Sequence, residues 1–313
     1  MVDGRTPFGY LGCMNMTSPP GRDAVKALVP ETAISPENRF TITAARHWPG
    51  KIRAEISDIV GAAHLWRLVW TLSVLDIQQR YRGSILGPFW LTLSTGVMIG
   101  AMGFIYAGLF HVNVRTYLPF LSLSLVLWNL MSAFTAEGST CFLGSEGMIR
   151  AMRMPLSMHA ARVVVRNYLV FAHNIVVIVV VFAVMRKLPG PYSFMIIPGF
   201  ALWTVDAFAI SLLLGVFCAR FRDIPPIVAS IMQIAFFVTP IIWSPAILLH
   251  RGIGKVLITW NPFAALLGII RDPLLGSPLE LMTWLVALGY SSVLIVAAGV
   301  IFSIARPRIA YWV

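Results

Sequence analysis

The feature that most constrains this chain is a run of 25 residues, 86–110, that contains no Asp, Glu, Lys or Arg. A bilayer core is about 30 Å thick, and a helix of about 20 apolar residues crosses it. Because 58% of the residues are hydrophobic and 12% are charged, an ordinary soluble enzyme is excluded. We predict an all-α polytopic membrane protein with six transmembrane helices. The other five are expected at 117–142, 167–185, 191–219, 224–243 and 281–305.

The apolar region between the fifth and sixth of these stretches, residues 244–278, is punctuated by proline. Its interval from Lys255 to Arg271 brackets only fifteen residues and is interrupted by Asn261-Pro262, so it is too short and too broken to span. Irregular backbone is tolerated at membrane depth only where other protein covers it. We therefore expect re-entrant external half-helices at about 244–278.

The distribution of basic residues predicts the orientation. Six spans put both termini on one side, and this side then holds 18 of the 24 Lys and Arg residues. The positive-inside rule assigns that side to the cytoplasm. The net charge of +11 is thus interpreted as contact with membrane lipids, and no nucleic-acid partner is expected.

The amino-terminal region divides into two parts. Residues 1–54 are predicted to be a mobile cytoplasmic extension, and they lack the basic and apolar regions of a cleaved signal peptide. Apolar residues then recur at mostly three- and four-residue spacing, which predicts an amphipathic interfacial helix over 55–82. Trp66 and Trp70 suit the headgroup level. The alternative is a cytoplasmic helix packed on other protein. Residues 83–313 form the expected transmembrane domain.

Gly83, Gly87 and Pro88 provide a turn between this helix and the first span. Arg80 and Arg82 precede the turn and are placed to meet anionic headgroups. From the residues alone, simple positive-inside anchoring is the favoured explanation of the same two arginines.

The sequence offers little for metal or redox chemistry. Cys13, Cys141 and Cys218 are far apart and form no CxxC pair, and the six histidines show no metal-ligand spacing. Glu137 and Asp206 are the two carboxylates inside predicted spans, where a charged group is costly and therefore a functional suspect. We interpret both as structural hydrogen-bond acceptors within the bundle.

Several segments of the chain form a recognisable set of motifs. They are Arg80–Trp90, residues 220–224, Thr239-Pro240-Ile241-Ile242-Trp243, Asn261-Pro262-Phe263, Arg271-Asp272 and the ending Arg308-Ile309-Ala310-Tyr311-Trp312. Together they resemble the membrane permeases of polysaccharide-exporting ABC transporters of the type-2 exporter superfamily, over about residues 55–313. The segment from Arg80 to Trp90 resembles the family's RYRxSxLGPxW motif, and residues 220–224 resemble its RxRD loop. The family's members export O-antigen, capsule, teichoic acid and galactan.

The resemblance implies a homodimer with two copies of a separate ATP-binding subunit, exporting a lipid-linked polysaccharide, with the chain a multi-pass protein of the bacterial inner membrane. No GxxxxGK[ST] motif occurs, so the chain is expected to bind no cofactor, and ATP and Mg would be held by the partner. The segment at about 144–160 matches the family's coupling helix. Its residues expected to contact the ATPase are Glu146, Arg150, Arg153 and Pro155.

The substrate path is also implied by the resemblance. The phosphate of a lipid anchor would meet Arg80 and Arg82 beside Leu86 and Gly87, because guanidinium groups form paired hydrogen bonds with phosphate oxygens. Aromatic rings that stack on sugar faces are expected along the first and fifth spans, although each ring is individually more typical of a lipid-facing or core position. The candidates are Trp90, Phe104, Tyr106, Phe236 and Phe237.

Three other functions compete with this one. An exporter of a small lipid or drug would share the superfamily but not the RYRxSxLGPxW motif. A membrane glycosyltransferase should show acidic clusters in its external loops, where we find only Asp272 and Glu280. A secondary carrier would commonly show internal repeats and more buried polar groups, and neither is found.

Overall fold

The computed structural model describes residues 48–84, 87, 89–245, 256, 258–278 and 280–313. Nearly all of the predicted extension 1–54 and Leu86 lie outside these residues. The described residues are helical and contain no strand, which confirms the predicted all-helical class. The helices are α2 (Trp48–His64), α3 (Trp66–Arg80), α4 (Phe89–Leu109), α5 (Val114–Ser139), η3 (Leu143–Ser145), α6 (Glu146–Ala151), α7 (Ser157–Met185), η4 (Ser193–Met195), α8 (Ile196–Arg220), α9 (Ile224–Val238), α12 (Pro262–Leu275) and α13 (Leu281–Trp312).

Five helices of the described part are long and apolar enough to cross a bilayer: α4, α5, α7, α8 together with η4, and α13. This agrees with a multi-pass membrane protein. The predicted fifth span, 224–243, contains α9, which has only 15 residues and a length of about 22 Å at 1.5 Å per residue. α9 stops at Val238 because Pro240 lacks a backbone donor and disfavours helix in the residue before it. The count of six spans stays a prediction.

Helix α5 is the centre of the bundle. It contacts α4, α7, α8, α9 and α12, and 72% of its most apolar window is buried, against 22% for α4 and α7. Leu121, Leu125 and Leu127 on α5 are each at most 2% exposed. Because α5 lies mostly inside the bundle, the outer faces of α4 and α7 are left for lipid or for another protein.

Helix α12 occupies the region predicted to be re-entrant. Asn261 caps its amino terminus by accepting hydrogen bonds from the backbone of Phe263 and Ala264, at 2.9 and 3.2 Å, and Pro262 takes the first helical position. The helix packs on α5, α8 and α13, so protein covers it. Whether it re-enters the membrane stays a prediction, and residues 246–255 and 257 lie outside the described part.

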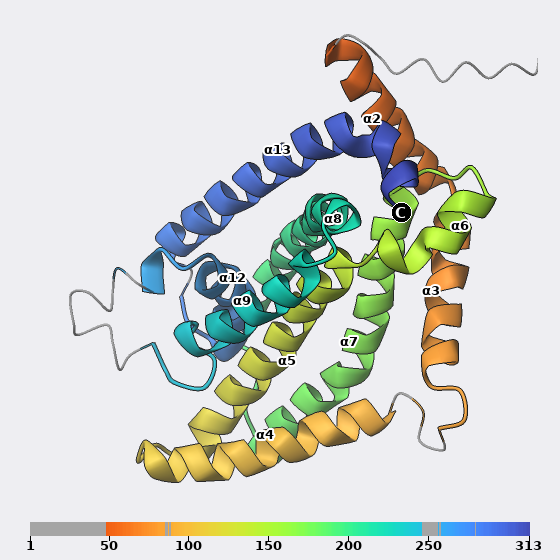
Figure 1. The fold of residues 1–313 in the computed structure, drawn as a ribbon. Helices are drawn as coiled ribbons and strands as arrows, with labels where there is room; N and C mark the ends of the chain where they lie inside the picture. Colours follow the sequence, from red (N-terminus) through yellow and green to blue (C-terminus); the bar gives the residue numbers. More distant parts are fainter. Residues whose placement is uncertain (1–47, 85–86, 88, 246–255, 257, 279) are drawn as a thin grey trace, which may run out of the picture. The chain divides into compact units, whose positions relative to one another are not determined.

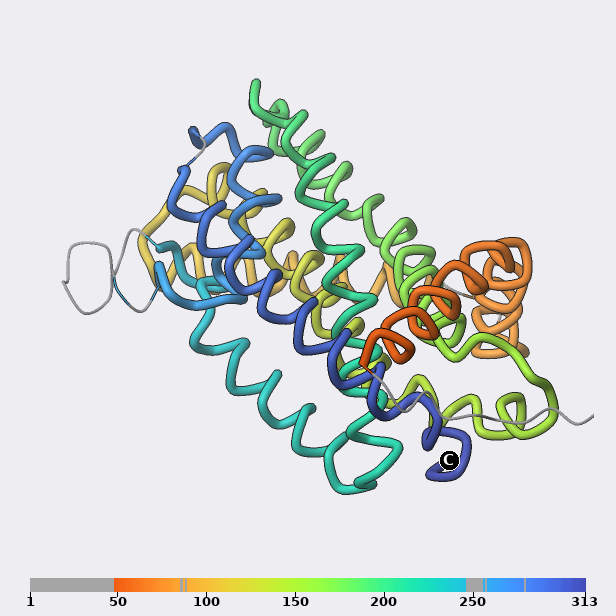
Figure 2. The backbone as a smooth tube through the Cα atoms, turned by 90° about the horizontal axis from the view of Figure 1, so that it is seen from above, coloured from red at the N-terminus to blue at the C-terminus, as the bar shows by residue number. Residues whose placement is uncertain are grey.

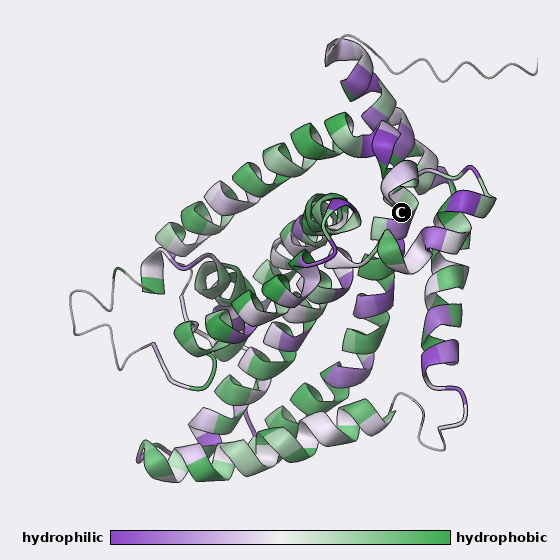
Figure 3. Ribbon diagram, in the orientation of Figure 1, coloured by the Kyte–Doolittle hydropathy of each residue, from purple (hydrophilic) through white to green (hydrophobic). Residues whose placement is uncertain are grey.

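The predicted interfacial helix 55–82 is two helices, α2 and α3, which meet at Leu65. α3 packs on α7 through Val69 and Ser73, whereas Trp66 and Trp70 are exposed, with ring centroids 5.7 Å apart. Figures 1 and 2 place α2, α3, α6 and the carboxyl-terminal end of α13 at one end of the bundle. We call this the polar end, because Figure 3 shows hydrophilic residues gathered there against a largely hydrophobic bundle.

Helix α7 begins at Ser157, ten residues before the predicted start of the third span at Asn167. The sequence placed Arg162 and Arg166 in a loop, but both are helical and mostly buried, with 18% and 17% of their side chains exposed. The predicted coupling segment 144–160 therefore comprises α6, a short connection and the first turn of α7.

Candidate functional site

An ion-pair network joins α3, α5 and α7 at the polar end. Glu137 of α5 binds Arg80, the last residue of α3, at 2.8 Å and Arg166 of α7 at 2.7 Å. Arg166 also binds Asp76 of α3 at 3.0 Å, and Asp76 in turn pairs with Arg162. Two carboxylates are thus shared among three guanidiniums, which leaves the cluster with one excess positive charge.

The Glu137 carboxylate is held on both of its oxygens. The side-chain amide of Asn167 donates a further hydrogen bond to it at 2.9 Å. The expected structural role of this carboxylate as a hydrogen-bond acceptor is what the structure shows. Partial burial would lower the pKa of Arg80, but the hydrogen bond and the charge of Glu137 outweigh it and raise that pKa.

The turn between α3 and α4 holds Arg82 and Gly87 and directly follows Arg80, so it contains or adjoins three of the four residues of the predicted lipid-phosphate site. Arg80 keeps 46% of its side chain exposed despite its ion pair, and Arg82 is exposed. Gly83 and Gly87 have φ angles of +86° and +54°, a region that residues with a Cβ rarely adopt. The hydroxyl of Ser84 accepts a hydrogen bond from the Gly87 amide at 3.1 Å, which closes the turn. Leu86, the fourth predicted member, is outside the described residues.

The predicted aromatic path consists of two separate sets in one chain. Tyr106 on α4 stacks on Phe110 with 5.7 Å between ring centroids. Phe236 on α9 packs against Trp128 of α5 at 5.8 Å, while the neighbouring Phe237 is 66% exposed. Trp90 and Phe104, the remaining candidates, are 58% and 67% exposed on α4. No ring contact among the described residues joins the α4 set to the α9 set.

Arg271 lies where three stretches that resemble the exporter permeases meet, residues 239–243, 261–263 and 271–272. Its side chain is 3% exposed, and its Nη1 donates to the carbonyl oxygen of Pro240 at 2.7 Å. Its Nε binds the Asp272 carboxylate at 2.8 Å, and its guanidinium carbon lies 4.8 Å from the centroid of the Phe120 ring on α5. The Asn261 side chain donates to the Thr239 hydroxyl at 3.2 Å. The three motif pieces are therefore one connected joint.

Asp58 of α2 is a second buried junction, at the polar end. The residue is 3% exposed, and its carboxylate accepts hydrogen bonds from the Ser157 amide and hydroxyl at 2.9 and 2.6 Å. It also binds Arg306 of α13 at 2.9 Å. Burial and then the charge of Asp58 raise the pKa of Glu55, against the opposing charge of Arg306. Asp58 thus connects α2, α13 and the start of α7.

The predicted coupling residues surround this junction. Arg150 pairs with Glu146 one helical turn away at 2.9 Å and donates to the carbonyl oxygen of Val313 at 2.6 Å. Pro155 packs against α2, where a Cβ added to Gly61 would lie 3.1 Å from its ring. Arg153 is exposed on the connection to α7. The segment 144–160 is therefore tied to both α2 and α13.

The RxRD-like loop and the aromatic ending also meet. The Arg220 guanidinium at the end of α8 lies 5.9 Å from the centroid of the Trp312 ring and 5.4 Å from that of Phe221. These separations fit cation–π contacts. Two further stretches of the resemblance, far apart in sequence, are thus in contact.

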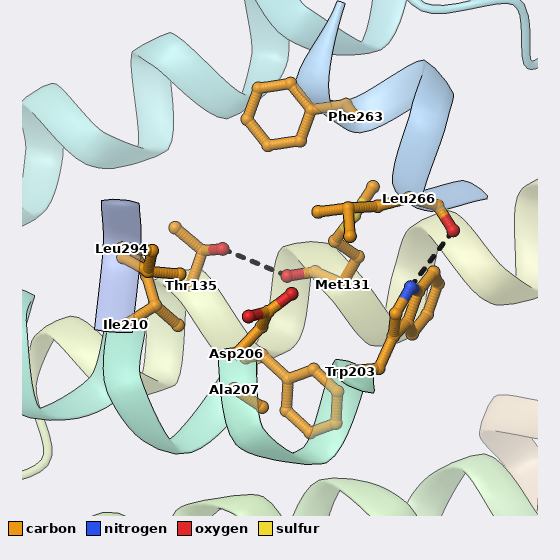
Figure 4. Close-up of a pocket in the computed structure, with 10 residues that line it drawn as sticks. Met131, Thr135, Trp203, Asp206, Ala207, Ile210, Phe263, Leu266 and Leu294 are labelled. Atoms are coloured by element: carbon orange, nitrogen blue, oxygen red, sulfur yellow. Dashed lines mark hydrogen bonds between the residues drawn. The ribbon is translucent and has the colours of Figure 1, made fainter. Parts of the chain in front are cut away.

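A cavity of about 100 Å³ lies between α5, α8, α12 and α13. Asp206 of α8 points its carboxylate into this space (Figure 4). The Ser291 hydroxyl of α13 donates to Asp206 at 2.6 Å, as expected for a structural acceptor. Sequence reasoning did not find the cavity, and it also missed Asp58, Asp76, Arg162, Arg166 and the role of Arg271 as a joint. The only feature of the sequence that could have indicated these residues was a charged side chain next to an apolar stretch.

The fold, with five helices of the described part long and apolar enough to cross a bilayer, defines a multi-pass membrane protein. No protein-family model matches the chain. It is 24% identical over 249 residues to the O-antigen export system permease protein RfbA of Klebsiella pneumoniae, covering 79% of this chain and 95% of that protein. It is also 24% identical over 204 residues to the protein of the same name from Myxococcus xanthus, covering 64% and 77%. These matches confirm the resemblance to permeases of polysaccharide exporters and indicate a transporter component rather than an enzyme.

Proposed function

We propose that this chain is the permease subunit of an ATP-driven exporter that moves a lipid-linked, O-antigen-like polysaccharide across the bacterial inner membrane, with both termini in the cytoplasm. The similarity over 79% of the chain to a permease named for O-antigen export carries the proposal. The contacts of Arg271 with Pro240 and of Arg220 with Trp312 support it. Each contact joins two stretches that resemble the exporter permeases and are far apart in sequence.

The anchor phosphate of the substrate would bind at the turn after α3. Arg80 already holds one oxyanion, the Glu137 carboxylate, in its ion pair, and about half of its side chain still faces outward. Arg82 is exposed beside it. A phosphate accepts paired hydrogen bonds from guanidinium groups, as a carboxylate does. The lipid phosphate would therefore share Arg80 with Glu137 and take Arg82 as its second contact.

The polymer path requires a second copy of the chain. The exposed aromatic residues Trp90, Phe104 and Phe237 belong to α4 and α9 and do not meet within one protomer. A two-fold homodimer would bring two such sets around one pore. Two ATP-binding subunits would hold ATP and Mg and push on the segment 144–160, which transmits motion to α5 and α7.

Co-purification tests the proposal directly. The tagged chain is purified in mild detergent, and its partners and ATPase activity are measured. We expect two copies of the chain with two copies of an ATP-binding subunit, and loss of surface polysaccharide with intracellular accumulation of its lipid-linked form in a deletion strain. A chain that purifies alone under several gentle conditions, from a strain whose deletion leaves surface polysaccharide unchanged, would overturn the proposal.

A further inference from the structure

The cavity beside Asp206 is built from four helices and is mostly apolar. It measures about 100 Å³, several times the 10–15 Å³ that one water molecule needs. None of its lining residues is a Lys, Arg or His. Besides Asp206, they include Phe134, Thr135, Trp203, Phe263 and Leu294.

Asp206 brings an incompletely satisfied carboxylate to this cavity. The residue is 7% exposed, and its Oδ2 accepts a hydrogen bond from the Ser291 hydroxyl at 2.6 Å. Its Oδ1 is buried and has no hydrogen-bond partner in the described part of the chain. A buried carboxylate without a counter-charge is costly in a membrane interior. The cavity therefore presents a strong acceptor that the protein itself leaves without a donor.

The other hydrogen-bond donors of the cavity wall, on the side chains of Thr135 and Trp203, already bind carbonyl oxygens of the protein. The Thr135 hydroxyl donates to the carbonyl oxygen of Met131 at 3.0 Å. The Trp203 indole N–H donates to the carbonyl oxygen of Leu266 at 3.0 Å, and Figure 4 shows both bonds at the cavity wall. The Thr135 oxygen can then only accept. An occupant of this space must supply hydrogen-bond donors, and positive charge would offset the carboxylate.

We propose that this cavity is a binding site for a small organic ammonium ion, held by Asp206 and Thr135. A metal cation such as Mg²⁺ prefers six or more oxygen ligands, whereas the side chains of this cavity offer three oxygens, one of which already accepts a hydrogen bond from Ser291. Its remaining walls carry the rings of Phe134, Trp203 and Phe263, which attract organic cations through their faces. Water would supply donors but leave the charge uncompensated.

The depth of Asp206 favours a free alkylamine over the ammonium group of a lipid. Asp206 is the eleventh of the 25 residues of α8, which places it about 15 Å from one end and about 21 Å from the other. A headgroup resides at the membrane surface and would have to be drawn to the middle of the bundle. The site does not depend on the polymer that the permease moves.

Ligand binding to the full-length protein in lipid nanodiscs tests the proposal. Saturation-transfer NMR would compare n-butylammonium with n-butanol, which has similar shape and no charge. We expect saturable binding of n-butylammonium at least about tenfold tighter than that of n-butanol, and a loss of about tenfold in Asp206→Asn. Asp223→Asn, a change at an exposed carboxylate in the loop after α8, should leave binding unchanged.

A second variant keeps the test decisive if Asp206→Asn does not fold. Leu294→Phe retains the carboxylate and fills the cavity, and it should abolish n-butylammonium binding. Equal affinities for the amine and the alcohol would mean that Asp206 is neutral and would overturn the proposal. The lipid composition of the nanodiscs separates the two sources of an ammonium group. If n-butylammonium binds in nanodiscs of phosphatidylglycerol alone but not in nanodiscs that contain phosphatidylethanolamine, the lipid headgroup occupies the site. That result would overturn the free-amine assignment.

Discussion

Asp58 on α2 binds Arg306 near the end of α13, with 2.9 Å between the carboxylate Oδ1 and the guanidinium Nη2. The same carboxylate accepts from the amides of Leu156 and Ser157, at 3.2 and 2.9 Å, where α7 begins. One buried side chain thus satisfies free amides at a helix start and a cation from another helix. Because α6 and its connection precede α7 directly, the position of the segment 144–160 depends on Asp58.

Replacing Asp58 by alanine should destabilise the polar end. The change leaves two backbone donors and the Arg306 charge without their shared acceptor, which costs about 2–4 kcal/mol of unfolding free energy. Thermal unfolding of the purified protein measures the effect. Glu146→Ala is the matched control, since it removes a largely exposed ion pair with Arg150 worth at most about 1 kcal/mol. Equal loss of stability in the two variants would contradict the junction.

Replacing Arg271 by lysine should weaken the joint between α9 and α12. Lysine keeps the charge but cannot at once reach the Pro240 carbonyl oxygen, the Asp272 carboxylate and the Phe120 face in the fork geometry of a guanidinium. We expect a loss of about 1–3 kcal/mol of unfolding free energy together with reduced export. Thermal unfolding measures stability, and surface polysaccharide measures export. Lys187→Arg, at a partly exposed position after α7, is the control. A stable, fully active Arg271→Lys would show that charge alone suffices.

Replacing Arg80 and Arg82, the two arginines before α4, tests whether they bind the phosphate of the substrate. We expect Arg80→Ala with Arg82→Ala to leave assembly intact and to impair export by about tenfold or more, because each charged hydrogen bond is worth about 1.5–3 kcal/mol. Surface polysaccharide and co-purification of the ATP-binding subunit measure the two properties.

Glu137→Gln is the informative comparison. It removes the internal partner of Arg80 while sparing both guanidiniums. If the arginines bind substrate phosphate, this variant retains more export than the double alanine variant. An equal defect in both would assign Arg80 a structural role, and undiminished export in the double variant would remove the proposed phosphate site.

Local features of the sequence predicted much of the fold, because a helix-length apolar stretch is defined by residues that are neighbours in the chain. Pro240 was a signal that α9 ends early, but the span was predicted to reach Trp243 because the apolar stretch continues past the proline. The start of α7 was misplaced because Arg162 and Arg166 looked like a boundary. Their charges are compensated by Asp76 and Glu137 from other helices, so the helix continues through them.

The contacts between distant residues could not be predicted in the same way. Asp58 and Arg306 are 248 positions apart, and nothing near either residue specifies the other. The cavity at Asp206 likewise arises only when α5, α8, α12 and α13 pack together. Asp206 was recognisable as an unusual acid in an apolar stretch. The lack of a hydrogen-bond donor to its Oδ1, and the hydrogen bonds that the nearby donors make elsewhere, arise only when the helices pack together.

Docking of the proposed ATP-binding subunit should depend on the charges of the segment 144–160. Arg150→Glu with Arg153→Glu reverses two charges on the exposed surface of the segment 144–160, so it should weaken the complex by about tenfold or more through repulsion where attraction existed. Co-purification at low and high salt measures it, and high salt should narrow the difference from the unmodified protein. Arg150 also binds Glu146 and the Val313 carbonyl, so the melting temperature of the permease alone must be compared. Reduced docking at an unchanged melting temperature supports a direct contact, whereas an unchanged complex places the ATP-binding subunit elsewhere.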